Sequence, residues 1–188
     1  MTTTPRQAAQ IAGGVWNIDQ NHSLIEFAAK HFDIAWVKGR FKSFSGKIDV
    51  NEQDLLQTTV ELTIDAASLD SQAVQMREDL IKGEEMLEVA KYPTIAFKST
   101  SISQQGPTDF VVTGDLTMRG ITRQVQIPLR FGGLVTTRMG PRAGFSGELT
   151  LNKSDFQVPF NREFEPGRYV VADDIKVELQ IEAAPAQT

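Results

Sequence analysis

The chain of 188 residues has a net charge of −5, with 40% hydrophobic and 23% charged residues. This length and composition fit one globular domain that can bury a sizeable core. The acidic balance argues against general nucleic-acid binding, and the absence of cysteine excludes disulfides, thiolate metal sites and thiol nucleophiles.

The two ends of the sequence read differently from its middle. The start, "MTTTPRQAAQIAGG", is polar and lacks the apolar core of a secretory signal, and no apolar stretch approaches the ~20 residues of a transmembrane helix. We therefore expect a protein that is not integral to a membrane. As written it would be cytoplasmic, or periplasmic if the sequence is a mature form. We expect residues 1–14 to be a flexible lead, 15–183 a single barrel domain and 184–188 a short tail.

Period-two alternation of apolar and polar residues dominates the chain and predicts strands. In "IEFAAKHF", Ile25, Phe27, Ala29 and His31 share one parity and would face the same side. Together the strands number about eight or nine, and short turns between strands with one apolar face indicate an antiparallel sheet that closes into a barrel or sandwich. They are expected near 15–20, 23–32, 36–50, 59–64, 95–98, 110–118, 125–131, 145–151 and 175–181.

One segment between the strands has helical spacing instead. Ala73, Met76 and Leu80 lie at i, i+3 and i+7, which predicts a helix. We expect Gly83 to end it and a second short helix to follow from Glu84, because the charges of Glu84 and Glu85 suit a helix N-terminus. The sequence thus predicts a helical insertion of roughly 20 residues that covers one end of the barrel.

Motifs for catalysis are few. If the first strands are continuous, His22 and His31 have opposite parity and are poor partners for one metal ion. The stretch "GFSGE" lacks the last glycine of a nucleophile elbow, and no phosphate-binding loop is present. We therefore expect neither enzymatic activity nor a cofactor nor a metal.

Apolar side chains are more numerous than catalytic ones, with 11 phenylalanines and five methionines. A barrel of about eight strands is either filled by its side chains or hollow enough for one small ligand. Flexible methionines and phenylalanines would suit a chain-like apolar ligand, and Arg77 on the helical stripe could contact an anion at the opening. The side chains that we expect to form the cavity include Phe27, Phe41, Phe97, Met76, Met86 and Met118.

Five stretches in register make the chain similar to the YceI-like family. They are "WNIDQNHSLIEFAAKHF", "VKGRFKSFSGKI", "IDAASLDS" with "REDL", "YPTIAFKST" and "VTGDLTMRGITRQVQIPL". The resemblance spans roughly residues 15–183. It implies a lipocalin-like antiparallel eight-stranded barrel with a helical segment, and non-covalent binding of polyisoprenoid chains or related long lipids.

Individual residues of this chain also match the family's motifs, and the sequence departs from those motifs at two places. Leu80 stands where many members have a histidine, and Met86-Leu87 replaces a double phenylalanine, which keeps the apolar character but changes the shape of the pocket. The residues that match the family's motifs are Asp19, His22, Phe27, His31, Gly39, Phe41, Arg77, Tyr92, Pro93, Phe97, Gly114, Leu116, Thr117 and Gly120. Our candidate ligand-binding residues are Phe27, His31, Phe41, Met76, Arg77, Leu80, Met86, Leu87, Phe97 and Met118.

The sequence is compatible with three functions, of which the first is the leading hypothesis. It is non-enzymatic storage, transport or sequestration of a long-chain amphiphile, with His31 as an inward polar group. The second is an enzyme that acts on such an amphiphile, with His31 as general base oriented by Asp19. The third is a ligand-free barrel that serves as a protein-interaction scaffold. A bound isoprenoid or acyl lipid is the expected partner, and a homodimer is left open.

Overall fold

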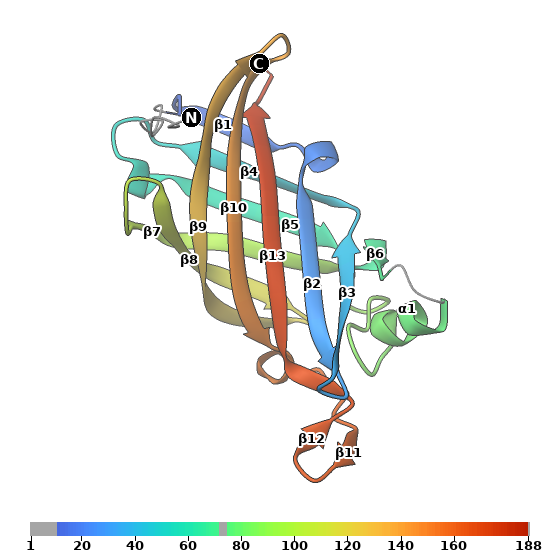
Figure 1. Ribbon diagram of the computed structural model, residues 1–188. Helices are drawn as coiled ribbons and strands as arrows, with labels where there is room; N and C mark the ends of the chain where they lie inside the picture. The colour runs from blue at the N-terminus through green and yellow to red at the C-terminus, as the bar shows by residue number, and fades with distance from the viewer. Residues whose placement is uncertain (1–10, 72–74, 188) are drawn as a thin grey trace, which may run out of the picture.

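The structure is a computed structural model that describes residues 11–71 and 75–187, and within these ranges it consists mainly of strands (Figure 1). The strands are β1 (Gly14–Ile18), β2 (Leu24–His31), β3 (Ala35–Phe41), β4 (Phe44–Val50), β5 (Thr59–Asp65), β6 (Leu69–Asp70), β7 (Thr94–Gln104), β8 (Asp109–Met118), β9 (Ile121–Thr137), β10 (Gly140–Asn152), β11 (Glu163–Glu165), β12 (Arg168–Tyr169) and β13 (Val171–Pro185). The helical elements are α1 (Gln75–Lys82) and the 3-10 turns η1 (Gln20–His22), η2 (Leu55–Gln57), η3 (Ala66–Ser68) and η4 (Lys153–Phe156).

Eight strands close into an antiparallel barrel. They pair in the order β1–β4–β5–β7–β8–β9–β10–β13, and β13 pairs back with β1, where Trp16 lies opposite Pro185 and Ile18 opposite Ala183. Closure leaves the ring without a free edge. The predicted all-β, lipocalin-like eight-stranded barrel is therefore confirmed.

The long strand β13 has two partners along its length. Its C-terminal part pairs with β1, and the rest pairs with β2, from Gln180 opposite Leu24 to Val171 opposite His31. The turn η1 separates β1 from β2, and the carboxylate of Asp19 caps it by accepting a hydrogen bond from the N–H of Asn21 at 3.0 Å. Beyond β2, the sheet continues through β3 and β6, so β2 and β3 add to the wall at the end of the barrel near α1 (Figure 1).

The tight turn between β8 and β9 shows how local sequence sets this register. Arg119 and Gly120 both have positive φ, 52° and 72°, as a two-residue hairpin turn of the favoured twist requires. Met118 and Ile121 face each other across the turn, and the pairing runs without interruption to Asp109 opposite Arg130. The glycine in "MRGI" therefore supplies the conformation that holds these two strands in register.

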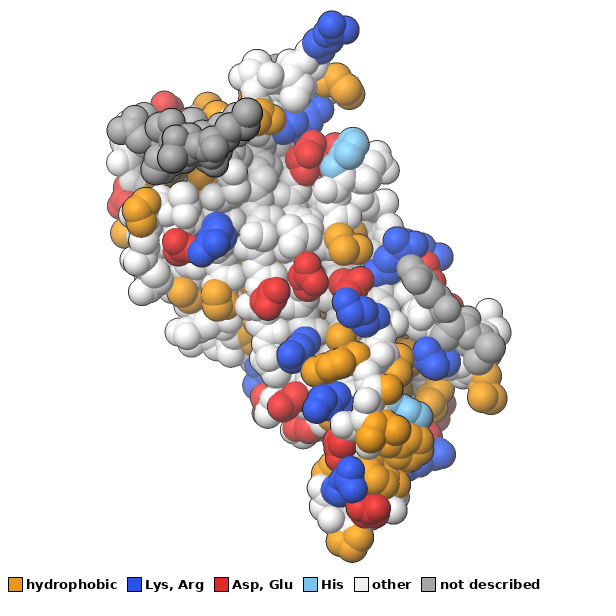
Figure 2. Space-filling view, viewed as in Figure 1, with side chains coloured by type: hydrophobic (Ala, Val, Ile, Leu, Met, Phe, Trp, Pro, Cys, Tyr) orange, Lys and Arg blue, Asp and Glu red, His pale blue; other side chains and the backbone are white. Residues whose placement is uncertain are grey.

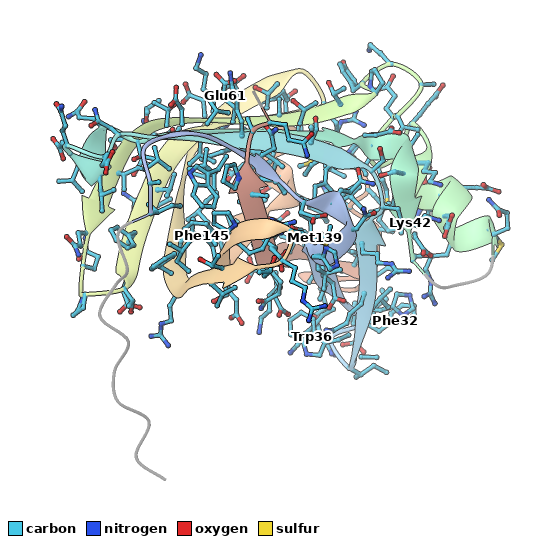
Figure 3. The ribbon with its side chains drawn as sticks, turned by 90° about the horizontal axis from the view of Figure 1, so that it is seen from above. Phe32, Trp36, Lys42, Glu61, Met139 and Phe145 are labelled. Carbon is cyan, nitrogen blue, oxygen red and sulfur yellow. The ribbon has the colours of Figure 1, made fainter. Side chains whose placement is uncertain are left out.

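Side chains alternate between the barrel interior and its outer surface. On β13, Leu179 is buried in a cluster with Phe41 and Ile64, whereas the neighbouring Glu178 and Gln180 face outwards. On the outer face, lysine, arginine and acidic side chains are interspersed (Figure 2), as in the 3.0 Å ion pair of Lys47 with Glu61. Trp36 also lies outside the ring of strands (Figure 3), with the ammonium groups of Lys30 and Lys176 over its ring. The core is therefore inside the barrel, as the alternation predicts.

The helical insertion differs in part from its prediction. The helix α1 ends before Gly83, as expected, while Ala73 lies outside the described residues. The predicted second helix from Glu84 is wrong, because residues 84–91 form successive turns and Glu88 has a φ of 50°, which an α-helix does not allow. None of the helices in the described part of the chain is long and apolar enough to cross a membrane.

The single strand expected over 36–50 is divided in two. Strand β3 ends at Phe41 and β4 begins at Phe44. Between them, the N–H groups of Lys42 and Ser43 donate to the backbone oxygen and the hydroxyl of Ser68, at 3.2 and 3.0 Å. This contact with η3 replaces the ladder hydrogen bonds of a continuous strand.

The closure of the barrel predicts that its two tryptophans contribute very differently to stability. Trp16 on β1 is 1% exposed and its indole N–H donates to the oxygen of Ala12 at 2.9 Å, whereas Trp36 is 45% exposed. We expect Trp16→Ala to lower the free energy of unfolding by about 3–5 kcal/mol, and the control Trp36→Ala to lower it by less than about 1 kcal/mol. Urea unfolding followed by circular dichroism measures both. Equal losses would contradict this account of the barrel closure.

Candidate functional site: two apolar chambers in the barrel

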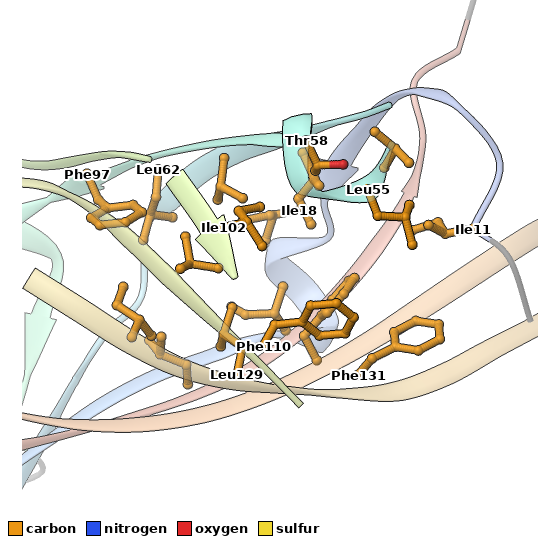
Figure 4. Close-up of a pocket in the computed structure, with 18 residues that line it drawn as sticks. Ile11, Ile18, Leu55, Thr58, Leu62, Phe97, Ile102, Phe110, Leu129 and Phe131 are labelled. Carbon is orange, nitrogen blue, oxygen red and sulfur yellow. The ribbon is translucent and has the colours of Figure 1, made fainter. Parts of the chain in front are cut away.

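A first cavity of about 180 Å³, which we call the N-terminal chamber, lies inside the barrel at the end near Ile11 and η2 (Figure 4). Among its described lining residues, Thr58 is the only one with a polar side chain. The wall is therefore suited to a hydrocarbon and offers almost no hydrogen-bonding groups. The lining consists of Ile11, Ile18, Ile48, Val50, Leu55, Thr58, Val60, Leu62, Phe97, Ile102, Phe110, Val112, Ile127, Leu129, Phe131, Phe145, Leu179 and Ile181.

A second cavity of about 170 Å³, the helix-side chamber, occupies the end of the barrel near α1. It is also lined mainly by aliphatic and aromatic side chains. Its lining consists of Ile25, Glu26, Phe27, Phe41, Leu62, Ile64, Ile81, Met86, Leu87, Ile95, Phe97, Leu116, Met118, Val125, Ile127, Leu149, Leu151, Lys153, Val158, Ile175, Val177 and Leu179. Four residues line both chambers, namely Leu62, Phe97, Ile127 and Leu179, so the two cavities adjoin inside one barrel.

Two charged residues border the helix-side chamber, and both have partners. Glu26 accepts a hydrogen bond from the ammonium of Lys38 at 2.5 Å. The ammonium of Lys153, a residue only 3% exposed, donates to the amide oxygen of Asn161 at 2.6 Å and lies 3.5 Å from Asp173. Neither charge is left unsatisfied, which is what an apolar cavity wall requires.

The contacts around Lys153 also lower the pKa of the Asp173 carboxylate. Burial raises its pKa, but hydrogen bonds from the hydroxyl and N–H of Ser154 and the nearby charge of Lys153 outweigh burial, so its pKa lies below the ordinary value. Asp173 therefore stays ionised beside Lys153 at neutral pH. These contacts fix η4, whose last residue Phe156 packs with Val158 and Phe160 at this end of the barrel.

A second segment at the same end is held by an arginine. The guanidinium of Arg119 donates to the backbone oxygens of Glu84 and Met86, and lies 3.2 Å from the carboxylate of Glu88. These contacts position Met86 and Leu87 so that both line the helix-side chamber. The turns after α1, rather than a second helix, therefore form the wall here.

The structure places six of the ten candidate residues on the helix-side chamber and four elsewhere. Those that line it are Phe27, Phe41, Met86, Leu87, Phe97 and Met118. On α1, Met76 is 78% and Leu80 37% exposed, and Arg77 is also exposed; none of the three is on either lining. His31 also lies outside both linings. Ligand contact stays a prediction for all ten.

His31 does not follow its strand neighbours into the cavity. It ends β2, and β13 has extra residues opposite this end, since Val171 pairs with His31 but Ile175 pairs with Ala29. Its ring packs edge-on against Phe32, with centroids 4.2 Å apart. The alternation therefore holds up to Phe27, and the irregular register changes the surroundings of His31.

Of the residues that line the N-terminal chamber, only Phe97 was among our ten candidates. Its phenylalanines Phe110, Phe131 and Phe145 come from β8, β9 and β10. The alternation of Phe131 with its neighbours signals an inward position, as for Phe27. What the sequence does not show is that these rings surround empty space rather than fill it.

The pairing of Asp19 with a histidine involves His22 rather than His31. His22 Nδ1 lies 2.9 Å from Asp19 Oδ2, and Glu182 completes a group with ligand atoms within 4.8 Å of one another. Arg142 Nε already lies 3.3 Å from Glu182. The hydrogen bond with Asp19 raises the pKa of His22, and that with His22 lowers the pKa of Asp19. None of these groups is on either chamber lining, so we assign the cluster to the attachment of η1 to β13.

Comparisons with known proteins fit this architecture. A family model described as YceI-like domain matches residues 16–183. The chain belongs to the YceI-like family. A UPF0312 protein of Vibrio parahaemolyticus is 34% identical over 152 residues, which is 80% of each chain. Among solved structures, Burkholderia cenocepacia BcnA superposes with a TM-score of 0.78 at 26% identity, covering 89% of this chain and 99% of BcnA. A polyisoprenoid binding domain from Saccharophagus degradans has a TM-score of 0.69 at 14% identity, covering 91% of this chain and 98% of that domain.

The Asp19–His22 pair of this YceI-like protein predicts a pH-dependent contribution to stability. Because the pKa of His22 is raised above its ordinary value of 6.5, its contribution is full below that value and is lost as the pH rises through the folded pKa. The contribution of Asp19, whose pKa is lowered, is lost as the pH falls through its folded pKa. We expect Asp19→Asn, which can still cap η1, to destabilise more at about pH 5.5 than at about pH 8.5.

The measurement is a titration of the His22 ring by NMR, together with urea unfolding at both pH values. In Asp19→Asn, the pKa of His22 should fall towards 6.5. The control Glu61→Gln removes a carboxylate whose partners are Lys47 and Lys98, and should leave the pKa of His22 unchanged. An unshifted pKa in Asp19→Asn would refute the pairing.

Proposed function

We propose that this protein is a non-enzymatic binding protein that holds the long apolar tail of an isoprenoid or acyl amphiphile inside its barrel. The observation that carries the proposal is the pair of adjoining chambers, about 180 and 170 Å³, with nearly continuous hydrocarbon walls. Such walls match a ligand that has many methylene or isoprene units and few polar atoms. Storage, transport and sequestration are all compatible with this activity.

Tail burial alone can supply useful affinity. Each buried methylene contributes ~0.8 kcal/mol, and micromolar binding requires roughly 8 kcal/mol. A tail of roughly ten methylenes beyond those that offset the cost of association therefore reaches this range without a specific polar contact. The fold adds support, because a domain with the same barrel in Saccharophagus degradans is described as polyisoprenoid binding.

The position of the titratable groups supports binding rather than conversion. The acid–base pair Asp19–His22 belongs to neither chamber lining, and His31 packs against Phe32 rather than Asp19. Of the two charged residues that border the helix-side chamber, Lys153 is engaged by Asn161 and Glu26 by Lys38. A general base would need free access to the buried ligand, and the described lining residues do not offer one.

The proposal predicts that a charge placed inside the barrel prevents binding. Ile127 on β9 lines both chambers, whereas its neighbour Gln126 is exposed on the outer face. In Ile127→Glu, the carboxylate would lose its hydration beside the tail, and we expect affinity for geranylgeraniol and palmitate to fall at least about 100-fold. The matched control Gln126→Glu adds the same charge outside and should bind like the wild type. Isothermal titration of delipidated protein measures both.

Circular dichroism and the unfolding midpoint show whether Ile127→Glu still folds. Should it unfold, Ile127→Asn provides a smaller polar change at the same position. Unchanged binding by a folded variant of either kind would refute the assignment of the chambers as the ligand site. Wild-type protein that takes up neither probe would refute the proposed function itself.

A further inference from the structure

Apolar side chains gather on the outside of the barrel, at the end that carries the β2–β3 turn and the β11–β12 hairpin (Figure 2). Ile34 is 83% exposed, Trp36 45% and Phe32 36%. The ring of Phe32 packs edge-on against Phe164 of β11, with centroids 5.1 Å apart, and Phe32 and Trp36 lie on the same side of the barrel (Figure 3). We call these four side chains the apolar end patch. None of them is on either chamber lining, so tail binding does not account for the patch.

The backbone of the β2–β3 turn favours residues other than the ones it contains. The N–H of Ile34 donates to the backbone oxygen of His31 at 3.1 Å, and Phe32 and Asp33 between them have φ values of 50° and 60°. Asparagine and glycine adopt this conformation most easily, whereas a phenylalanine in it costs conformational energy. The turn thus presents two large apolar side chains at an exposed tip in spite of this cost.

Two lysines flank the exposed indole of Trp36. Nζ of Lys176 lies 4.6 Å from the centroid of the ring, and Nζ of Lys30 lies 5.7 Å from it. Both lysines are exposed, and neither forms an ion pair with a carboxylate in the described part of the chain. Two positive charges without a counter-charge therefore stand beside the apolar end patch.

An arginine holds two acidic side chains of this end. Arg168 forms ion pairs with Asp33 of the turn at 3.0 Å and with Glu165 of the hairpin at 2.6 Å, and its guanidinium lies 4.7 Å from the ring centroid of Phe164. These contacts tie the β2–β3 turn to the β11–β12 hairpin. Because the whole chain has a net charge of −5, attraction to an anionic surface depends on such a local arrangement of cations.

We propose that the apolar end patch docks this protein on a lipid bilayer whose surface carries anionic phosphate head groups. Phe32 and Ile34 enter the boundary of the acyl chains, which removes their apolar surface from water. The indole of Trp36 lies at the level of the head groups, where an apolar ring with one polar N–H is favoured. Lys30 and Lys176 keep their stems along apolar surface and direct their ammonium groups to the phosphates. This inference goes beyond tail binding and does not depend on it.

Flotation of the full chain with lipid vesicles tests the proposal. We expect binding to vesicles of phosphatidylglycerol and phosphatidylcholine in equal amounts, and weaker binding to phosphatidylcholine alone or at raised salt. Because Trp16 is only 1% exposed, a shift of the tryptophan emission to shorter wavelength on binding reports the burial of Trp36. Trp36→Phe should abolish this shift.

A charge at the tip of the turn should prevent docking. In Ile34→Asp, a carboxylate replaces the apolar side chain and faces the phosphates, so affinity for the anionic vesicles should fall at least about tenfold. The matched control is Met139→Asp, which adds the same charge at an 82% exposed position between β9 and β10, at the opposite end of the barrel (Figure 1). It should bind vesicles like the wild type.

The contribution of the lysines is tested separately. The double variant Lys30→Gln with Lys176→Gln should bind the anionic vesicles about tenfold more weakly and bind phosphatidylcholine nearly unchanged. Its control is Lys47→Gln with Lys98→Gln, which makes the same change in net charge at two lysines that both pair with Glu61. Equal losses in the two double variants would show an effect of net charge and overturn the role of Lys30 and Lys176.

Further outcomes would overturn the docking site as a whole. They are the absence of vesicle binding by the wild type, or equal losses in Ile34→Asp and Met139→Asp. Dimerisation that Ile34→Asp abolishes, without any vesicle binding, would assign the patch to a second copy of the chain instead. Titration with geranylgeraniol in free solution should give the same affinity for Ile34→Asp and the wild type, because Ile34 is on neither lining. Failure of docking and failure of tail binding are therefore distinguishable.

Discussion

The pairing of β13 with both β1 and β2 is the constraint on which the rest of the structure depends. Backbone hydrogen bonds from Trp16 to Ile18 close the ring, and those from Leu24 to His31 attach the strand that follows. An open sheet of these strands would expose an edge and one apolar face to water. Once the ring is closed, the inward side chains line a space of fixed circumference, and whether they fill that space depends on their sizes. The chambers therefore follow from closure combined with the choice of inward residues.

Glycine is the inward residue that leaves the interior hollow. The ring of Phe27 lies over Gly39, where a Cβ would come within 2.4 Å of it, and the ring of Phe97 lies over Gly114. In each case the aromatic ring lies against the wall instead of projecting towards the barrel axis. A barrel of about eight strands can be filled by its own side chains. Placing the two rings over glycines leaves cavity volume in the interior, and the protein loses side-chain packing there. Burial of a ligand tail against the same rings can restore the apolar contacts that the empty barrel lacks.

The sequence predicts the barrel much better than it predicts the site. Alternation reflects a backbone period of two, and it identified the inward faces that contain Phe27, Phe97 and Phe131 because each strand obeys that period locally. The error in the second helix has a non-local cause, since Arg119, in the turn between β8 and β9, holds the turns after Gly83 from far along the chain. His31 departs from its neighbours because of extra residues on β13. Cavity volume depends on the whole circumference at once, and no window of sequence contains it.

The distribution of charge inside the barrel limits what the chambers can recognise. Lys153 donates a hydrogen bond to Asn161 and pairs with Asp173, and Glu26 accepts a hydrogen bond from Lys38. Neither of these two charges is therefore left unpaired for a ligand. Discrimination between amphiphiles must then come from the tail, through its length, branching and stiffness, or from groups outside the chambers that contact the head. Apolar contacts distinguish similar tails weakly, because one methylene changes affinity by only ~0.8 kcal/mol. Leu62, Phe97, Ile127 and Leu179 line both chambers, so substitutions at these four positions change the walls that short and long tails share.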